Sequence, residues 1–285
     1  MTKGYLFIAN NTDTVDYVRL SYACALSIKH SQPTDSNQIA IATDNPKLIE
    51  QLRCGWVFNH VIEYTGPTGM DSRSRAYDQT PFDETVLLDS DMLFLKPMNH
   101  YWYYLKDYYL CVANKPQSYK GQAFKYGYYR KVFEDYQLPD VYNAWTYFKK
   151  DARTQEFFEL VKLMTDNPDP FIKKFLPNSN LKTLPTDEAF ALAIKILDIE
   201  DEVTHLHAFP PFTHMKPMTQ GWSNYHAEWR DKVRFNLDKD ERVKIGVWPQ
   251  QELCHYVDKD AMSQSSIEIL ESNVWNRKAE LSTFM

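Results

Sequence analysis

The chain has 285 residues, 44% of them hydrophobic, so it is long and apolar enough to bury a core and is not disordered. It carries 32 Lys and Arg against 38 Asp and Glu, a net charge of −6 that argues against a general nucleic-acid coat protein. Only 8 residues are glycine, and neither G-x-G-x-x-G nor G-x-x-x-x-G-K-[ST] occurs. If the protein handles phosphates, groups other than a glycine-rich loop must hold them.

The first hundred residues alternate between short apolar runs and amphipathic segments. The first two runs end in polar turn residues, Asn10 and Asn11 after one and Asp44 after the other. This alternation predicts a parallel α/β sheet with ligand sites at the carboxyl ends of its strands. The expected strands cover residues 5–9, 39–43, 57–64 and 85–88, with the apolar run at 92–97 continuing beyond the last.

Apolar residues that recur about every 3.6 positions predict the helices. The expected helices cover residues 15–30, 46–52, 154–164, 187–197 and 266–281, with one or two helical turns at 71–77. Thr186 is expected to cap the helix that follows it, and the stretch with Pro168, Pro170 and Pro177 is expected to be a loop. Residues 99–147 form a Tyr-rich stretch, and the chain from Val203 onward mixes short strands and turns.

The cysteine pattern and the lack of a long apolar stretch bear on location. Four cysteines without a C-x-x-C pair predict buried thiols in a reducing compartment. No apolar run reaches the roughly 18 residues of a membrane-spanning helix. We therefore expect a soluble, cytoplasmic protein without membrane contact, and a single domain, because the sequence has no repeat or obvious linker.

Asp89 and Asp91 follow the apolar run at residues 86–88 directly. Residues two apart in an extended segment project to the same side, so the two carboxylates can address one point. Mg²⁺ and Mn²⁺ prefer such oxygen ligands and commonly bridge carboxylates to substrate phosphates. A solvated turn after a strand is the alternative, but the position at the ligand-binding edge of a sheet favours a functional pair.

Around this pair the chain resembles nucleotide-sugar glycosyltransferases of the GT-A fold, in particular the retaining enzymes of glycosyltransferase family eight. The run at residues 86–94 is similar to that family's hydrophobic D-x-D strand, and the overall texture resembles glycosyltransferases encoded by bacteriophages. The resemblance implies a Rossmann-like mixed sheet flanked by helices, with C-terminal elaborations. It divides one catalytic domain, residues 1–285, into a nucleotide-sugar-binding half (1–100), an acceptor-side half (101–220) and a C-terminal extension (221–285).

Three later segments are similar to motifs of the same family. Residues 141–145 lie where the family has an Asn-Ser-Gly type segment, residues 186–189 resemble its Asp-Gln motif, and residues 213–218 resemble its late His, Gly, Lys-Pro-Trp motif. The last departs from the pattern, because only one residue separates His214 from Lys216. His205 and His207 are therefore alternative histidines for that position.

The resemblance implies a role for each candidate site residue. Mn²⁺ or Mg²⁺ would be held by Asp89, Asp91 and His214. The catalytic residues would be Glu188, near the anomeric carbon as a nucleophile or cation stabiliser, and Asp187, which would hold donor or acceptor hydroxyls. The residues expected to contact the nucleotide-sugar donor are Ala9, Asn10, Asn11, Asp44, Arg73, Arg75, Ser90 and Lys216. Each also has a structural explanation: turn formation for the strand-end residues, surface charge for the arginines, and the helix dipole for the two acids at 187–188.

Residues 108–133 contain five Lys and Arg, no acid and many aromatic rings. This composition is typical of nucleic-acid or nucleotide contacts, but rings also stack on sugars and pack core edges. Three interpretations stay open: a polyanionic acceptor, a sugar or nucleotide contact, and a structural role. The first predicts transfer to hydroxymethylated bases of phage DNA, with the target base extruded from the stack, in the host cytoplasm.

The sequence thus predicts a metal-dependent glycosyltransferase that uses a UDP-linked sugar and retains its configuration, acting on DNA or alternatively on a glycan or protein. An aspartyl-nucleophile phosphohydrolase also uses a D-x-D after a strand, but has Thr or Val where Leu93 stands. A non-catalytic nucleotide-sugar-binding module is the remaining alternative.

Overall fold

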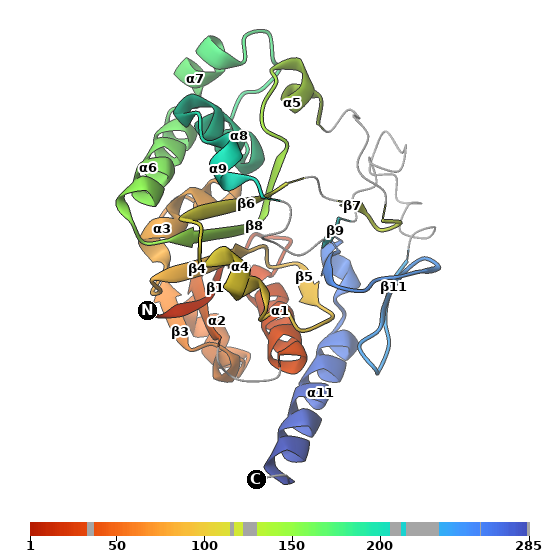
Figure 1. The fold of residues 1–285 in the computed structure, drawn as a ribbon. Helices are drawn as coiled ribbons and strands as arrows, with labels where there is room; N and C mark the ends of the chain where they lie inside the picture. The colour runs from red at the N-terminus through yellow and green to blue at the C-terminus, as the bar shows by residue number, and fades with distance from the viewer. Residues whose placement is uncertain are drawn as a thin grey trace.

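The computed structural model describes residues 1–32, 37–114, 117–121, 130–205, 212–214, 234–256 and 258–283. Its centre is a six-stranded sheet that carries helices on both faces (Figure 1). The strands of this sheet are β1 (Lys3–Ile8), β2 (Gln38–Thr43), β3 (His60–Glu63), β4 (Glu84–Leu88), β6 (Leu110–Asn114) and β8 (Val141–Lys149).

The sheet is mixed, as expected, with the order β3-β2-β1-β4-β8-β6. The first four strands run parallel, and β8 runs antiparallel to both β4 and β6. The Tyr-rich stretch therefore supplies β6 at the edge of the sheet and most of β8 inside it. The sequence pattern did not predict either strand. β8 is buried along almost its whole length, so its sequence lacks the polar and apolar alternation of a half-exposed strand.

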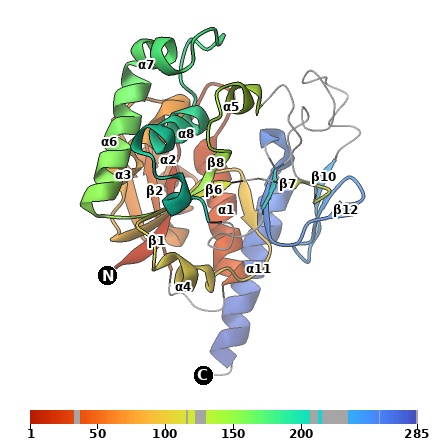
Figure 2. The same cartoon turned by 45° about the horizontal axis from the view of Figure 1, so that its top comes forward.

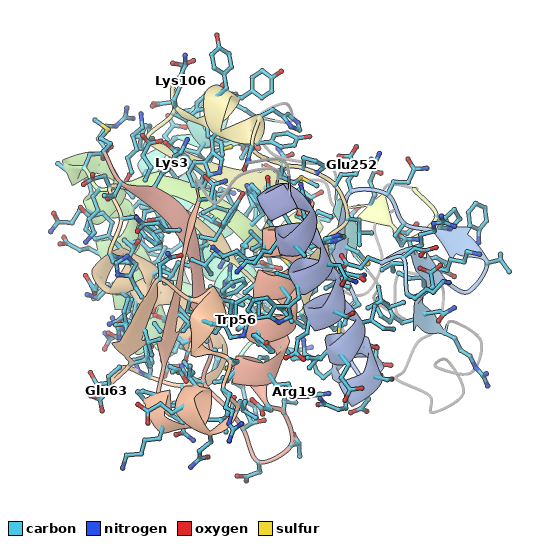
Figure 3. The ribbon with its side chains drawn as sticks, turned by 90° about the horizontal axis from the view of Figure 1, so that it is seen from below. Lys3, Arg19, Trp56, Glu63, Lys106 and Glu252 are labelled. Atoms are coloured by element: carbon cyan, nitrogen blue, oxygen red, sulfur yellow. The ribbon has the colours of Figure 1, made fainter. Side chains whose placement is uncertain are left out.

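The two faces of the sheet carry separate hydrophobic cores, because neighbouring residues of a strand point to opposite sides. Tyr5 and Phe7 of β1 pack toward α1 (Tyr17–Ser31) and α11 (Gln264–Thr283), whereas Leu6 packs toward α6 (Ala152–Asp166) and α8 (Thr186–Leu197). Figure 2 shows α6 and α8 on one side of the sheet and α11 on the other. Trp56 lies beside α11, with its ring 4.9 Å from that of Trp275 (Figure 3).

Two smaller sheets stand beside the main one. A four-stranded sheet has the order β5-β13-β9-β7, and a three-stranded antiparallel sheet has the order β10-β11-β12. Their strands are β5 (Met92–Phe94), β7 (Gln117–Ser118), β9 (Phe212–His214), β10 (Phe235–Leu237), β11 (Val243–Ile245), β12 (Trp248–Pro249) and β13 (Leu253–His255). The apolar run at 92–97 thus does not extend β4 but pairs antiparallel with β13 near the carboxyl end of the chain.

The remaining helices are short. They are α2 (Pro46–Gln51), α3 (Ala76–Gln79), α4 (Tyr101–Leu105), α5 (Lys131–Asp135), α7 (Pro168–Phe175) and α9 (Glu200–Val203), with 3-10 turns at Gly55–Val57, Gly69–Arg75 and Lys259–Ala261. All four cysteines are buried free thiols, as expected.

Three local predictions were wrong. Pro168 and Pro170 lie in α7 and not in a loop, because Pro168 occupies the first turn, where its missing N–H costs nothing, whereas Pro177 lies in the turn after the helix. Thr186 is the first residue of α8 and not its N-cap, a position that Pro185 holds. The third strand is shorter than expected, because residues 55–57 form a 3-10 turn before it.

Candidate metal centre

Asp89 and Asp91 lie at the carboxyl end of β4, in the middle of the sheet, and their backbone joins two sheets. The Asp89 N–H donates to the carbonyl of Ala144 in β8 (3.1 Å), and the Asp91 carbonyl accepts from the N–H of Tyr256 just after β13 (3.1 Å). Both acids are therefore held by regular backbone bonds on either side. The side chain of Ser90 between them accepts a hydrogen bond from the hydroxyl of Ser21 in α1 (2.8 Å).

The structure brings a histidine to the acid pair. His255, the last residue of β13, has its Nε2 2.9 Å from Asp91 Oδ2 and 3.7 Å from Asp89 Oδ2. One ligand atom from each of the three side chains can be chosen so that all lie within 4.8 Å of one another. Two carboxylates and an imidazole are a donor set that suits Mn²⁺ or Mg²⁺ well. The chemistry of the described residues therefore fits the divalent cation that the D-x-D pattern predicts.

A tyrosine fixes the orientation of that histidine. The Tyr142 hydroxyl of β8 lies 2.8 Å from His255 Nδ1, and both side chains are buried. When Nδ1 carries the ring proton and donates it to the tyrosine oxygen, Nε2 presents its lone pair toward the two carboxylates. A second hydrogen bond of this kind is the usual means by which a protein orients a metal-binding imidazole.

Lys259 is a second partner of Asp91. Its ammonium donates to the same Asp91 Oδ2 that His255 contacts. Burial on its own would raise the pKa of the Asp91 carboxyl, but His255 and Lys259 together hold that pKa far below its usual value. Burial would lower the pKa of Lys259, and the Asp91 charge more than offsets this, so the lysine pKa lies above its usual value. Both groups are therefore charged at neutral pH.

Arg73 connects the acid pair to the start of α8. Its Nη1 donates to Asp89 Oδ1 (2.5 Å) and to the carbonyl of Leu88 (3.1 Å), and its Nη2 donates to the carbonyl of Asn143. The Asn143 N–H in turn donates to Asp187 Oδ1 (2.8 Å). One residue of β8 thus links the predicted metal site with the acid predicted to contact the sugar, 98 positions after the D-x-D.

The strand-end residues predicted to contact the nucleoside share the carboxyl edge of the sheet with the acid pair. Asn10 is 5% exposed, and its side-chain nitrogen and oxygen are both buried without a hydrogen-bond partner among the described residues. Buried amides are rarely left in this state, so the position suits a polar ligand. Asn11 instead caps α1, accepting from the N–H of Val18 (3.1 Å), while Ala9 is buried and Asp44 exposed.

The other predicted residues are spread more widely. Arg75 pairs with Asp166 of α6 (2.5 Å), and the His205 ring stacks on Tyr108 with centroids 4.3 Å apart. The backbone of His214 lies in β9, paired in register with His255 of β13. Glu188 follows Asp187 in the first turn of α8. The side chain of His214 and the whole of His207 and Lys216 lie outside the described residues.

Sequence reasoning missed His255, Lys259 and Tyr142. The one available signal was a histidine at the end of a short apolar run, followed four residues later by a lysine, which repeats the His and Lys order expected at residues 214–216. The sequence around this run does not indicate that it pairs with β5. The contact with Asp91 depends on that pairing across 164 residues.

The basic aromatic stretch is less cationic than its composition suggests. Arg130 is 6% exposed and pairs with Asp140 and, at 3.5 Å, with Asp187, both outside the stretch. Its guanidinium also lies 3.6 Å from the centre of the Phe133 ring. This arginine therefore supports the start of β8 and α8, and the described residues give a DNA acceptor no support.

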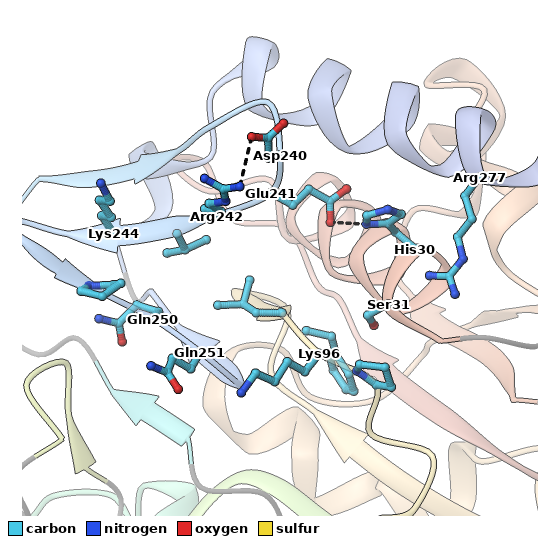
Figure 4. Close-up of a pocket in the computed structure, with 15 residues that line it drawn as sticks. His30, Ser31, Lys96, Asp240, Glu241, Arg242, Lys244, Gln250, Gln251 and Arg277 are labelled. Atoms are coloured by element: carbon cyan, nitrogen blue, oxygen red, sulfur yellow. Dashed lines mark ion pairs between the residues drawn. The ribbon is translucent and has the colours of Figure 1, made fainter. Parts of the chain in front are cut away.

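A separate pocket of about 490 Å³ lies away from the acid pair (Figure 4). It is formed by the carboxyl end of α1, the segment after β5 and the β10–β11 hairpin, with Lys96, Lys244 and Arg277 among its walls. Tyr17 at the start of α1 lies near Lys259, whereas His30 near its end lines the pocket. Phe94 and Leu95, three and four residues after Asp91, also line the pocket, so at about 3.3 Å per residue of strand its near wall is about 10 Å from the metal centre.

No protein-family model matches the chain, and no curated protein does. Mouse xyloside xylosyltransferase 1, in its apo form, is similar in structure with a TM-score of 0.53 and 10% identity, covering 90% of this chain and 97% of that one. The galactosyltransferase LgtC, solved with donor and acceptor sugar analogues, has a TM-score of 0.50 and 12% identity over 96% and 95%. The glycosyltransferase GlyE of Streptococcus pneumoniae TIGR4 reaches 0.46 and 11%, over 96% of this chain and 60% of its own.

In the part of the chain that is described, no helix combines the length and apolar character that crossing a membrane requires. The likeness to the xylosyltransferase and to LgtC spans nearly the whole of all three chains. At these identities it concerns the fold, and it gives the suggested bacteriophage origin no support. The chain has the fold of the GT-A glycosyltransferases, including members of family eight.

Proposed function

We propose that this protein is a metal-dependent glycosyltransferase that moves a sugar from a nucleoside diphosphate, UDP by preference, to an acceptor hydroxyl with retention of configuration. The observation that carries the proposal is the cluster of Asp89, Asp91 and His255 at the carboxyl edge of a GT-A sheet. The same fold likeness favours this function over a phosphohydrolase that would use one of the acids as a nucleophile.

In this proposal the three side chains of the cluster hold Mn²⁺ or Mg²⁺. A cation bound there stabilises the negative charge that develops on the leaving diphosphate. Tyr142 keeps the imidazole turned toward the carboxylates, and Arg73 keeps Asp89 in place through its two strand carbonyls. His214 and Lys216 stay candidates for the same site, the first because its backbone adjoins that of His255.

The donor would lie along the carboxyl edge of the sheet. Asn10 has two unpartnered polar atoms among the described residues that a nucleoside can satisfy, with Ala9, Asn11, Ser90 and Asp44 around it. The Asp187 carboxylate accepts from the N–H of Asn143 in β8, and in this proposal it would contact hydroxyls of the donor sugar or the acceptor. Glu188, the next residue, would stabilise the anomeric carbon. Arg75, which pairs with Asp166, contributes only if that ion pair opens.

The described residues constrain the acceptor less than they constrain the donor. A glycan, a protein or a hydroxymethylated DNA base each offers a hydroxyl, and the stretch 108–133 motivates the last of these through its remaining lysines. Incorporation of radiolabelled sugar into hydroxymethylated DNA, compared with glycan and peptide acceptors, decides between them. Labelling of glycan or peptide alone would reject the DNA acceptor.

The test of the donor function is a titration of UDP, followed by hydrolysis of a panel of UDP-sugars in water. We expect UDP binding and slow hydrolysis with Mn²⁺, and loss of both when a chelator is added. Asp89→Asn should abolish both, whereas Asp240→Asn, which removes an exposed carboxylate near the remote pocket, should leave both intact. A UDP affinity that is unchanged by the chelator, or no nucleotide binding at all, would contradict the proposal.

A further inference from the structure

The carboxylates of the candidate metal centre are already neutralised by the protein. Arg73 pairs with Asp89 and Lys259 pairs with Asp91, so two negative charges meet two positive ones. Asp91 is 3% exposed, and its Oδ2 accepts from Lys259 and lies 2.9 Å from His255 Nε2. A divalent cation bound to these oxygens would lie next to the Lys259 ammonium. Two neighbouring positive charges repel strongly in a partly buried site.

The two cations are not held equally firmly. Arg73 has a 13% exposed side chain and is anchored by the carbonyls of Leu88 and Asn143 as well as by Asp89. Lys259 has a 27% exposed side chain, and among the described residues its ammonium makes one hydrogen bond, to Asp91, with the Tyr17 ring centre 5.6 Å away. A lysine is also a mobile point charge on a flexible stem, whereas the planar guanidinium is fixed by its several bonds. Lys259 is therefore the group that can leave.

We propose that Lys259 competes with the divalent cation for Asp91, so that the metal affinity of the free protein stays low until the diphosphate of the donor takes over the lysine ammonium. This inference rests on the proposed function, because it needs a metal and a diphosphate at this site. Lys259 acts as a positioning residue in two ways: it neutralises Asp91 without metal, and it neutralises phosphate oxygens with metal bound.

The competition makes the binding of metal and diphosphate mutually reinforcing. Metal binding releases an ammonium that favours the diphosphate, and the diphosphate holds that ammonium away from Asp91. By linkage each ligand must raise the affinity for the other by the same factor. Removing the lysine charge should consequently have opposite effects on the two ligands, an outcome that simple damage to the site would not produce.

The test is calorimetric titration of the full chain with Mn²⁺ alone, and then with UDP at saturating Mn²⁺. Lys259→Met, which keeps an unbranched stem without charge, should bind Mn²⁺ alone about tenfold more tightly and UDP about tenfold more weakly. Lys259→Arg should lie close to the wild type for Mn²⁺ alone, because it keeps the charge. Lys96→Met, a lysine of the remote pocket, serves as the matched control and should change neither affinity.

Equal or weaker Mn²⁺ binding by Lys259→Met, with the wild type binding Mn²⁺ and UDP normally, would overturn the competition and leave the proposed function standing. Absence of Mn²⁺ binding in wild type and variant alike would overturn both. Thermal unfolding without ligand shows whether Lys259→Met is folded, and Lys259→Arg provides the second measurement if it is not.

Discussion

The edge of the main sheet and the small sheet beside it both contribute to the candidate metal centre, but in different ways. Asp89 and Asp91 continue a central buried strand, so one segment of sequence carries both the strand and the acids. His255 and Lys259 arrive from the far end of the chain through β13, a three-residue strand that pairs with β5. The comparison teaches that the acids are set by local pattern, whereas the groups that tune them depend on a long-range pairing.

The largest effect is expected at the point where both regions meet. Asp91→Asn should lower turnover by more than about 1,000-fold, since it removes a metal ligand and a charge at once. It should also lower the free energy of unfolding by about 1–3 kcal/mol, because the half-buried ammonium of Lys259 loses its charged partner. Steady-state kinetics and urea unfolding measure the two. Turnover within tenfold of the wild type would contradict the role of Asp91.

The same variant should change the pH dependence of stability. The pKa of Asp91 is lowered in the folded state, so its contribution is complete above the unfolded value near 4 and is lost as the pH falls through the lower folded pKa. Wild type and Asp91→Asn should therefore differ most in unfolding free energy above about pH 5 and converge in acid. A difference in unfolding free energy that grows toward low pH would contradict a lowered pKa of Asp91 in the folded state.

Replacing the histidine of the small sheet should have the next largest effect. His255→Gln should weaken Mn²⁺ binding by about 100-fold, while β13 keeps its backbone pairing with β5. The control is His60→Gln, an exposed histidine of β3 that bonds only Gln38 among the contacts described. Unchanged Mn²⁺ affinity in His255→Gln would leave the small sheet with a purely structural role.

The tyrosine behind the histidine allows a finer test. Tyr142→Phe removes the hydroxyl that orients His255 and should weaken Mn²⁺ binding by about tenfold, the lower end of such outer contacts. Tyr77→Phe, which removes a hydroxyl bonded to the carbonyl of Asp151, should leave Mn²⁺ binding unchanged. Equal effects of the two substitutions would indicate general destabilisation instead of orientation.

The smallest effect is expected at the remote pocket. Arg277→Ala and Lys244→Ala should change UDP binding by less than about twofold, because the ion pairs of the acid cluster are made by Arg73, His255 and Lys259, and charges are screened over about 8 Å at physiological salt. Calorimetry on both variants checks this. A tenfold loss of UDP binding would show that the donor extends to the pocket and that its placement along the sheet edge is wrong.

The sequence predicted the parts of the fold and site that depend on local pattern, and it did not predict those that depend on long-range pairing. The parallel strands and the acid pair came from apolar runs that end in polar residues, a pattern that each segment carries by itself. β8 could not be predicted, because a strand buried on both faces lacks the polar and apolar alternation of a half-exposed strand. The partners of Asp91 could not be predicted either, because β5 and β13 are three residues each and neither sequence specifies the other.

The most direct measurement is the anomalous scattering of manganese in crystals grown with Mn²⁺ and UDP. The account predicts one strong peak between the carboxylates of Asp89 and Asp91 and Nε2 of His255, with the Lys259 ammonium displaced from Asp91 toward the diphosphate. A manganese peak elsewhere, or UDP bound at the sheet edge with no metal at the three side chains, would contradict the central claim.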